Sequence, residues 1–330
     1  MPTSNTASLY GTVTKSFHWL TAILIIALIP MGVIANQLPY ETSEQLAQKA
    51  QLFSLHKTLG VVVFFVALAR ILWAVRQIKP GHLHTDRKLE TWAADVMHWL
   101  LYISLVIVPL SGWIEHAATS GFAPIWWPFG QSLPFVPKDE YFAHVFASLH
   151  WIFGKVMVLS ILLHVAGSLK HHFVDRDNTL SRMWFGASDS PKVSAKAPSI
   201  AAPIGAIAAL ITATAAGGAA GFFAPSETIE AASLEAVQSD WTVSEGQIGI
   251  AAQQFSSPLE GEFTDWTADI SFDPTPADIM GNVTTTISIG SLTLGSVTDQ
   301  AMGPNFFDQS QFATATFTAD IMPDGETFSA

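Results

Sequence analysis

The chain has 330 residues, of which 49% are hydrophobic and 13% are charged, with a formal net charge of −12 and no cysteine. Soluble domains carry about 25% charged residues, so this composition indicates a membrane protein with a soluble part. Without cysteine the chain can form no disulfide, iron–sulfur cluster, thiolate metal site or covalently attached c-type haem.

The charge is distributed unevenly along the chain. All 15 Lys and Arg lie at or before Lys196 together with 11 acidic residues, whereas 16 acidic residues and no basic one lie from Ala197 onward. The net charges of the two parts are therefore +4 and −16. Such different parts are expected to face different surroundings, and nucleic acid is not an expected partner of either.

Four long apolar stretches predict an all-α transmembrane bundle, because about 20 apolar residues cross the hydrocarbon core of a membrane. They cover residues 16–36, 53–75, 93–114 and 144–173. The first stretch has no A-x-A cleavage site and is long enough to span, so it is read as a helix rather than a signal peptide.

A linker rich in Ser, Lys and Pro, about 186–200, leads to an Ala/Gly-rich stretch at about 201–224. This stretch is long enough to cross the membrane once and predicts a fifth transmembrane helix. A flexible Ala/Gly linker is the alternative, because few of its residues are strongly apolar.

Histidines recur at matching depths in these helices. His18 and His56 lie near the starts of the first two, and the fourth carries His150 and His164. The last two are fourteen positions apart, nearly four turns, so they point to one face about 21 Å apart. If successive helices alternate in direction, His18 lies at the depth of His164, and His56 at that of His150. Two such pairs predict two non-covalent, bis-histidine b haems; helix-to-helix hydrogen bonding is the alternative for a single histidine.

The positions of the basic residues predict which parts of the chain lie on the cytoplasmic side of the membrane. Lys and Arg are concentrated in the loop 76–88 and the tail 170–182, and Lys15 precedes the first helix. Segments rich in Lys and Arg stay in the cytoplasm. The N-terminus and the pair containing His18 are then on the cytoplasmic side. The part of the chain from about residue 225 lies outside, in the periplasm of a bacterium.

The last part of the chain has the composition of strands. Segments rich in Thr, Ile, Val and Phe, separated by Gly, Pro and Asp, predict antiparallel strands within 241–255, 259–274, 281–292 and 312–321. Six apolar residues on them are predicted to line an apolar cavity: Phe263, Trp266, Ile270, Phe272, Ile287 and Ile289.

Three segments of the helical part match a known family: LHKTLG…ALARILW, MHWLLYISLVIVPLSGW and HVAGSLKHHFVDRDNTLSRMWFG. Through them residues 1–185 resemble the bacterial cytochrome b561 family of di-haem membrane cytochromes. The resemblance implies a haem-binding four-helix bundle in which His18, His56, His150 and His164 are the axial ligands.

Two segments of the C-terminal part, QIGIAAQQFSSPLEGEFTDWTADISFDP and FFDQSQFATATF, match another family. Through them the region 225–330 resembles the YceI-like lipocalin-type domain, a periplasmic β-barrel associated with isoprenoid lipids. The match covers roughly the first half of that domain, so the resemblance implies a partial barrel and an isoprenoid lipid as ligand.

Three further residues are predicted to lie beside the haems. Arg70 is expected to pair with a haem propionate, or alternatively to reach the cytoplasmic interface. Lys155 is expected to pair with a propionate of the outer haem or to attract an anionic substrate, unless it reaches the membrane surface. Gly60 is expected to let a haem edge approach the backbone, or to serve helix packing. His98 is the substitute if one ligand is misassigned.

These features are compatible with two functions. The favoured one is electron transfer across the bacterial inner membrane, between ubiquinone and a donor or acceptor at the outer face. The resemblance adds superoxide oxidation coupled to quinone reduction as an activity of the family. The alternative is a membrane-anchored periplasmic carrier of isoprenoid lipid or quinone, but an anchor needs no histidines at paired depths.

Overall fold

The computed structural model describes residues 2–119, 123–126, 130–186, 191–196, 199–224, 243–254, 257–273, 278–324 and 327–329, with single residues at 234, 237, 239, 241 and 275. Its contacts divide it into two compact units, one built mainly from five long helices and one mainly from the C-terminal strands. The predicted linker and the start of the predicted β-region fall partly outside the described residues.

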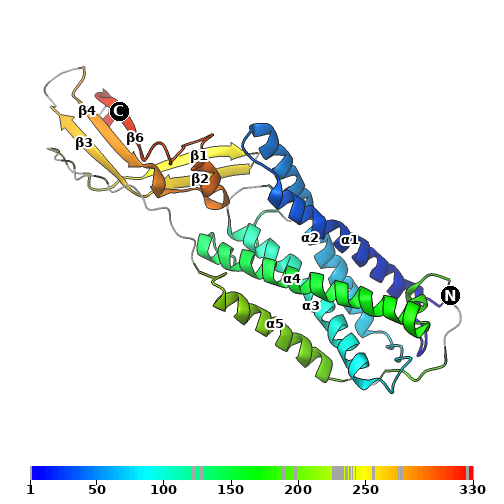
Figure 1. The fold of residues 1–330 in the computed structure, drawn as a ribbon. Coiled ribbons are helices and arrows are strands. Elements are labelled where there is room, and N and C mark those ends of the chain that lie inside the picture. Colours follow the sequence, from blue (N-terminus) through cyan, green and yellow to red (C-terminus); the bar gives the residue numbers. More distant parts are fainter. Residues whose placement is uncertain are drawn as a thin grey trace. The chain divides into compact units, whose positions relative to one another are not determined.

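The first unit contains α1 (Thr12–Gln37), α2 (Ser43–Val75), α3 (Lys88–Ala118), α4 (Glu140–Lys170) and α5 (Ala201–Ala219) (Figure 1). These five helices of the described chain are long and apolar enough to cross a membrane. The predicted transmembrane bundle with a fifth helix is therefore confirmed, and the Ala/Gly-rich stretch is a helix rather than a flexible linker.

α2 and α4 begin before the predicted apolar stretches, because polar side chains cap their first turns. α2 begins at Ser43, ten residues before the predicted start, and the hydroxyl oxygen of Thr42 accepts the N–H of Gln45 at 3.2 Å. α4 starts after Asp139, whose carboxylate accepts the N–H of Phe142 at 2.6 Å. Side chains of this kind satisfy the free N–H groups of a first turn, so hydropathy alone misplaces both helix starts.

An apolar layer from α1 to α4 fills the middle of the bundle. Its buried members are Ile25, Leu28, Val63, Ala67, Leu105, Val108 and Met157. On α4, Met157 lies midway between His150 and His164 in sequence. The layer therefore lies between the two histidine levels and excludes water from the space between them.

Small side chains join α5 to the bundle. Ala202, Ala206 and Leu210 of α5 form a buried cluster with Val96 and Leu100 of α3, and α5 runs beside α3 and α4 (Figure 1). Small residues let the backbones of membrane helices approach closely, which is the packing expected from this Ala-rich sequence.

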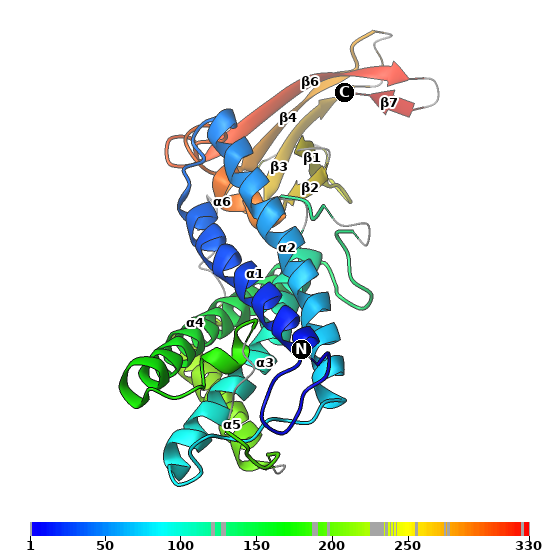
Figure 2. The same ribbon diagram turned by 90° about the vertical axis from the view of Figure 1, so that its right-hand side faces the viewer.

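The second unit contains two antiparallel sheets (Figure 2). One has the order β1–β2–β5 and the other β3–β4–β6–β7, formed by β1 (Ile248–Gln254), β2 (Ser257–Phe263), β3 (Trp266–Phe272), β4 (Gly281–Ser288), β5 (Leu292–Thr293), β6 (Thr314–Asp324) and β7 (Thr327–Ser329). Within the described residues the strands form two sheets and no closed barrel, in agreement with the predicted partial barrel.

The chain passes from the first sheet to the second at Thr264 and Asp265, which divide the predicted segment 259–274 into two strands. Ser291 holds this corner, because its carbonyl accepts the N–H of Thr264 at 3.3 Å and its hydroxyl oxygen accepts that of Asp265 at 3.1 Å. No glycine or proline marks the corner, so the sequence pattern did not reveal it.

The core of the second unit contains several of the residues predicted for an apolar cavity. Phe263 and Ile289 are buried in a cluster with Leu292 and Met302, and Ile287 packs against it. In the second half of β3, from Ala268 to Phe272, the burial alternates, as a strand with one covered face requires.

Candidate haem-binding sites

The structure brings the four predicted histidines together in two pairs. The ring centres of His18 on α1 and His164 on α4 are 6.3 Å apart, and those of His56 on α2 and His150 on α4 are also 6.3 Å apart. An imidazole bound through one nitrogen has its ring centre about 3 Å from the metal, so two imidazoles on opposite sides of one iron have centres about 6 Å apart. Each pair therefore fits a bis-histidine iron.

Hydrogen bonds fix both rings of the His56–His150 pair. Nδ1 of His56 lies 3.1 Å from the carbonyl oxygen of Leu28, and Nδ1 of His150 lies 2.8 Å from that of Val108. Because a carbonyl oxygen only accepts, each Nδ1 carries the proton and each Nε2 keeps its lone pair. Hydrogen bonds of this kind orient a metal-bound imidazole and raise its basicity, so both rings are arranged as Nε2 ligands.

Two glycines provide room for these rings. Gly32 lies four residues after Leu28, and Gly112 lies four residues after Val108, so each glycine shares a helix face with the carbonyl that holds a ring. A Cβ on Gly32 would lie 2.8 Å from the His56 ring, and one on Gly112 would lie 2.9 Å from the other ring. Sequence reasoning did not assign these two glycines to the site.

Three other glycines leave space beside the paired rings. Gly60, Gly154 and Gly167 each follow a paired histidine by three or four residues, and so share its helix face. A Cβ on any of them would meet no atom within 4 Å. The predicted role of Gly60 beside a haem edge stays a prediction.

Arg70 lies beside the His18–His164 pair. Its Nη1 donates to the hydroxyl oxygen of Thr21 on α1 at 2.6 Å, and its guanidinium carbon lies 5.1 Å from the ring centre of Tyr102 on α3. The side chain is thus held between α1 and α3 within the bundle.

Two other predicted residues have different surroundings. Lys155 is exposed on α4, with its Nζ 5.1 Å from the ring centre of Trp151, so its contact with a propionate remains a prediction. His98 packs beside the His18–His164 pair, with its ring centre 5.1 Å from that of His164. That separation is shorter than the about 6 Å that two ligands of one iron require, and Nδ1 of His98 lies 2.7 Å from the carbonyl oxygen of Ala94, so a hydrogen-bonding role fits His98 better than ligation.

A polar network next to His56 was missed by the sequence analysis, which gave His116 no role. The amide oxygen of Gln131 accepts the N–H of Ile125 at 3.0 Å and also contacts Nε2 of His116. Nε2 therefore donates, which leaves Nδ1 of the same ring to accept from the Lys57 ammonium at 3.1 Å. Lys57 directly follows His56 in α2, so this network lies at the same level of the helix as the His56–His150 pair.

The paired rings, the bonded Nδ1 atoms and the space beside the glycines fit haem b. Residues 9–186 match the family model for prokaryotic cytochrome b561. Cytochrome b561 homolog 2 of Escherichia coli (strain K12) is 33% identical over 195 residues, which cover 58% of this chain and 98% of that protein. The chain belongs to the prokaryotic cytochrome b561 family. It is therefore a multi-pass membrane b-type cytochrome that binds haem b and transfers electrons.

Other relatives of this cytochrome b561 chain cover the same part. Cytochrome b561 homolog 1 of Escherichia coli (strain K12) is 26% identical over 166 residues, which are 50% of this chain and 91% of that protein. The probable superoxide oxidase CybB of Yersinia pestis is 23% identical over 175 residues, which are 53% of this chain and 94% of that protein. Residues 238–324 match the family model for the YceI-like domain, which confirms the second resemblance.

Proposed function

We propose that this chain carries electrons across a bacterial inner membrane through two b haems and exchanges them with ubiquinone. The observation that carries the proposal is the presence of two histidine pairs with the same 6.3 Å separation. The two histidines of α4 are fourteen positions apart, which corresponds to about 21 Å along the helix, so the pairs lie at two depths. When bound, haem b supplies one-electron redox chemistry at each depth.

The protein side chains hold and tune these sites. His18 with His164, and His56 with His150, are the proposed axial ligands, and the carbonyls of α1 and α3 orient the second pair. Arg70 is the proposed partner of a propionate at the first pair, because its guanidinium is held inside the bundle beside it. The apolar layer around Met157 keeps water out of the space between the two sites.

The proposed orientation has the N-terminus in the cytoplasm. Lys15 donates to the carbonyl of Trp184 at 2.9 Å, and Arg87 pairs with Asp175 at 2.9 Å. These contacts join the N-terminal segment, the α2–α3 loop and the α4 tail at one end of the helical unit. A shared basic end supports a cytoplasmic location. The proposed domains are 1–185, a linker at 186–200, a fifth span at 201–224 and a periplasmic domain at 225–330.

The electron donor or acceptor at the outer site is proposed to be superoxide or a protein partner. The first follows from the relative whose name is probable superoxide oxidase. The acidic C-terminal part, with its net charge of −16, opposes the approach of an anion and favours the second.

A second proposed activity is lipid binding by the C-terminal unit, which the YceI-like match favours. An open pocket of about 540 Å³ lies there, with Trp241, Val243 and Trp266 among its lining residues. Polar residues, among them Ser239, Glu245 and Thr267, also line this pocket, so the proposal that this unit carries an isoprenoid chain or a quinone tail rests on the YceI-like match.

The purified protein in liposomes that contain ubiquinol tests the electron-transfer proposal. With ferricyanide, which does not cross the bilayer, on the outside, we expect reduction of ferricyanide and transient reduction of haem. A protein with its haem bound that reduces ferricyanide no faster than protein-free liposomes would show that the function is different. Cutting the chain after Ala224 separates the lipid activity, because that variant should keep electron transfer and lose bound lipid.

A further inference from the structure

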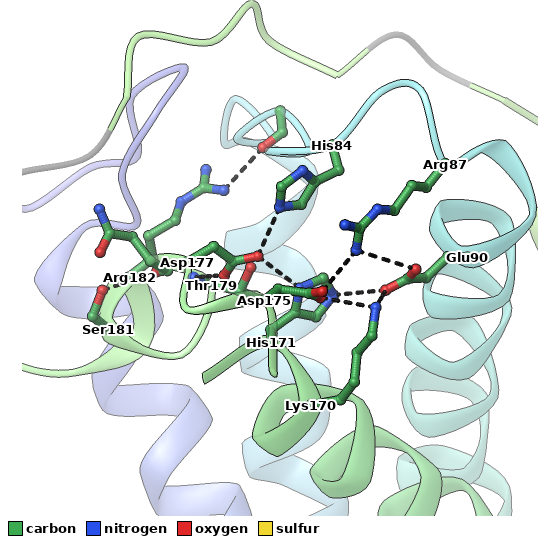
Figure 3. Close-up of polar contacts among 12 residues, drawn as sticks. His84, Arg87, Glu90, Lys170, His171, Asp175, Asp177, Thr179, Ser181 and Arg182 are labelled. Carbon is green, nitrogen blue, oxygen red and sulfur yellow. Dashed lines mark hydrogen bonds and ion pairs between the residues drawn. The ribbon is translucent and has the colours of Figure 1, made fainter. Parts of the chain in front are cut away.

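A cluster of imidazole and carboxylate groups lies at the end of α4 (Figure 3). We infer that His84, His171 and Asp177 form a binding site for one divalent transition metal ion such as Zn²⁺. The inference does not depend on the proposed function, because none of these residues contributes to a haem site.

The three ligand atoms converge on one point. Oδ2 of Asp177 lies 2.9 Å from Nε2 of His84 and 2.7 Å from Nδ1 of His171, and all three atoms lie within 4.8 Å of one another. Two ligands about 2 Å from a tetrahedral ion are about 3.3 Å apart, so a small outward movement admits the ion. The two imidazole rings are nearly parallel, at 10°, with centres 6.0 Å apart.

The backbone is shaped to bring Asp177 back to His171. α4 ends in a π-helical turn at His171–Asp175, and Arg176 has a left-handed φ of 55°. The N–H of Asp177 then donates to the carbonyl of His171 at 3.1 Å. A π-turn followed by a non-glycine residue at positive φ is unfavourable in itself, and such features gather at functional sites.

Neighbouring groups orient the ligands. Nε2 of His171 faces the Glu90 carboxylate at 3.3 Å, which directs Nδ1 toward the site in the arrangement that zinc-bound histidines adopt. The other carboxylate oxygen of Asp177 accepts the N–H of Thr179 at 2.7 Å.

The charges around the cluster favour this set over its neighbour. Glu90, His171 and Asp175 also lie close together, but Lys170 pairs with both carboxylates, at 2.6 and 2.8 Å, and Arg87 pairs with Asp175. Those carboxylates are already neutralised. In the part of the chain that the structure describes, both ion pairs of Asp177 are with imidazoles.

The donor set also selects the class of ion. Two imidazole nitrogens and one carboxylate oxygen suit Zn²⁺ and its neighbours, whereas Mg²⁺ and Ca²⁺ prefer oxygen ligands. Three protein ligands leave a fourth position for water. Because His84 lies in the α2–α3 loop and the other two ligands at the end of α4, the bound ion joins these two segments.

The test measures the metal content of the haem-loaded protein. The protein is purified without a polyhistidine tag, exposed to ZnCl₂ and then passed through a desalting column. We expect about one Zn²⁺ per chain by elemental analysis. When MgCl₂ replaces ZnCl₂, we expect no Mg²⁺ to be retained. His84→Gln and Asp177→Asn should each weaken Zn²⁺ binding at least tenfold, and Glu90→Gln about tenfold. His172→Gln is the matched control, because His172 is the exposed neighbour of His171 and should bind as the wild type does.

The haem absorption spectrum of each variant reports whether the chain is still folded. If folded His84→Gln and Asp177→Asn bind as much Zn²⁺ as His172→Gln, the site is elsewhere and the inference is wrong. If the wild type retains no Zn²⁺, the three groups form a hydrogen-bonded cluster without an ion, which also overturns it.

Discussion

Replacing Gly112 by Ala should damage one haem site and spare the other. The new Cβ would lie 2.9 Å from the His150 ring, whereas unstrained contacts are about 3.5 Å or longer, so the ring must retreat by about 0.6 Å. Its 2.8 Å hydrogen bond to Val108 then lengthens to about 3.4 Å, beyond good hydrogen-bond geometry. Loss of an orienting hydrogen bond costs about 10–100-fold in metal affinity, which is about 1.4–2.7 kcal/mol.

The assay is haem content per chain together with a spectroelectrochemical titration. We expect a fall in the haem held by His56 and His150 and a shift in its midpoint potential, with the other component unchanged. Gly218→Ala on α5 is the control, because a Cβ there meets Phe223 at an ordinary 3.5 Å. A Gly112→Ala protein with both components unaltered would refute the account of how the ring is held.

Three further predictions concern other parts of the chain. Arg70→Gln should lower the midpoint potential of the haem at His18 and His164 by about 50 mV, since a positive charge nearby favours the reduced state; an unchanged or higher potential would place the guanidinium elsewhere. A reporter active only in the periplasm, fused after Ala224, should be active, and activity of a cytoplasmic reporter there would reverse the orientation. Ser291→Ala should speed amide hydrogen exchange at Asp265 about 5–30-fold, as loss of about 1–2 kcal/mol implies, and equal exchange would show that this corner does not depend on the hydroxyl.

The features predicted from sequence are those that local patterns determine. Apolar length predicts which stretches form the long helices, and the period of 3.6 residues places His150 and His164 on one face. The pairing with His18 and His56 follows from alternating helix direction alone. None of these predictions needs to know which side chain on one helix touches which on another.

The features that were missed depend on contacts across helices or on single polar groups. Gly32 and Gly112 matter because rings from other helices lie over them, which no pattern within α1 or α3 reveals. The link between Lys57 and His116 joins residues 59 positions apart. The corner at Asp265 depends on one serine hydroxyl rather than on a turn residue.

The central claim is that two haems are each held by one histidine from α4 and one from an earlier helix. A redox titration of four alanine variants, monitored by visible absorbance, tests it most directly. We expect His18→Ala and His164→Ala to lose the same redox component, and His56→Ala and His150→Ala to lose the other. The claim is contradicted if His18→Ala loses the component that His150→Ala loses, or if all four variants keep both components.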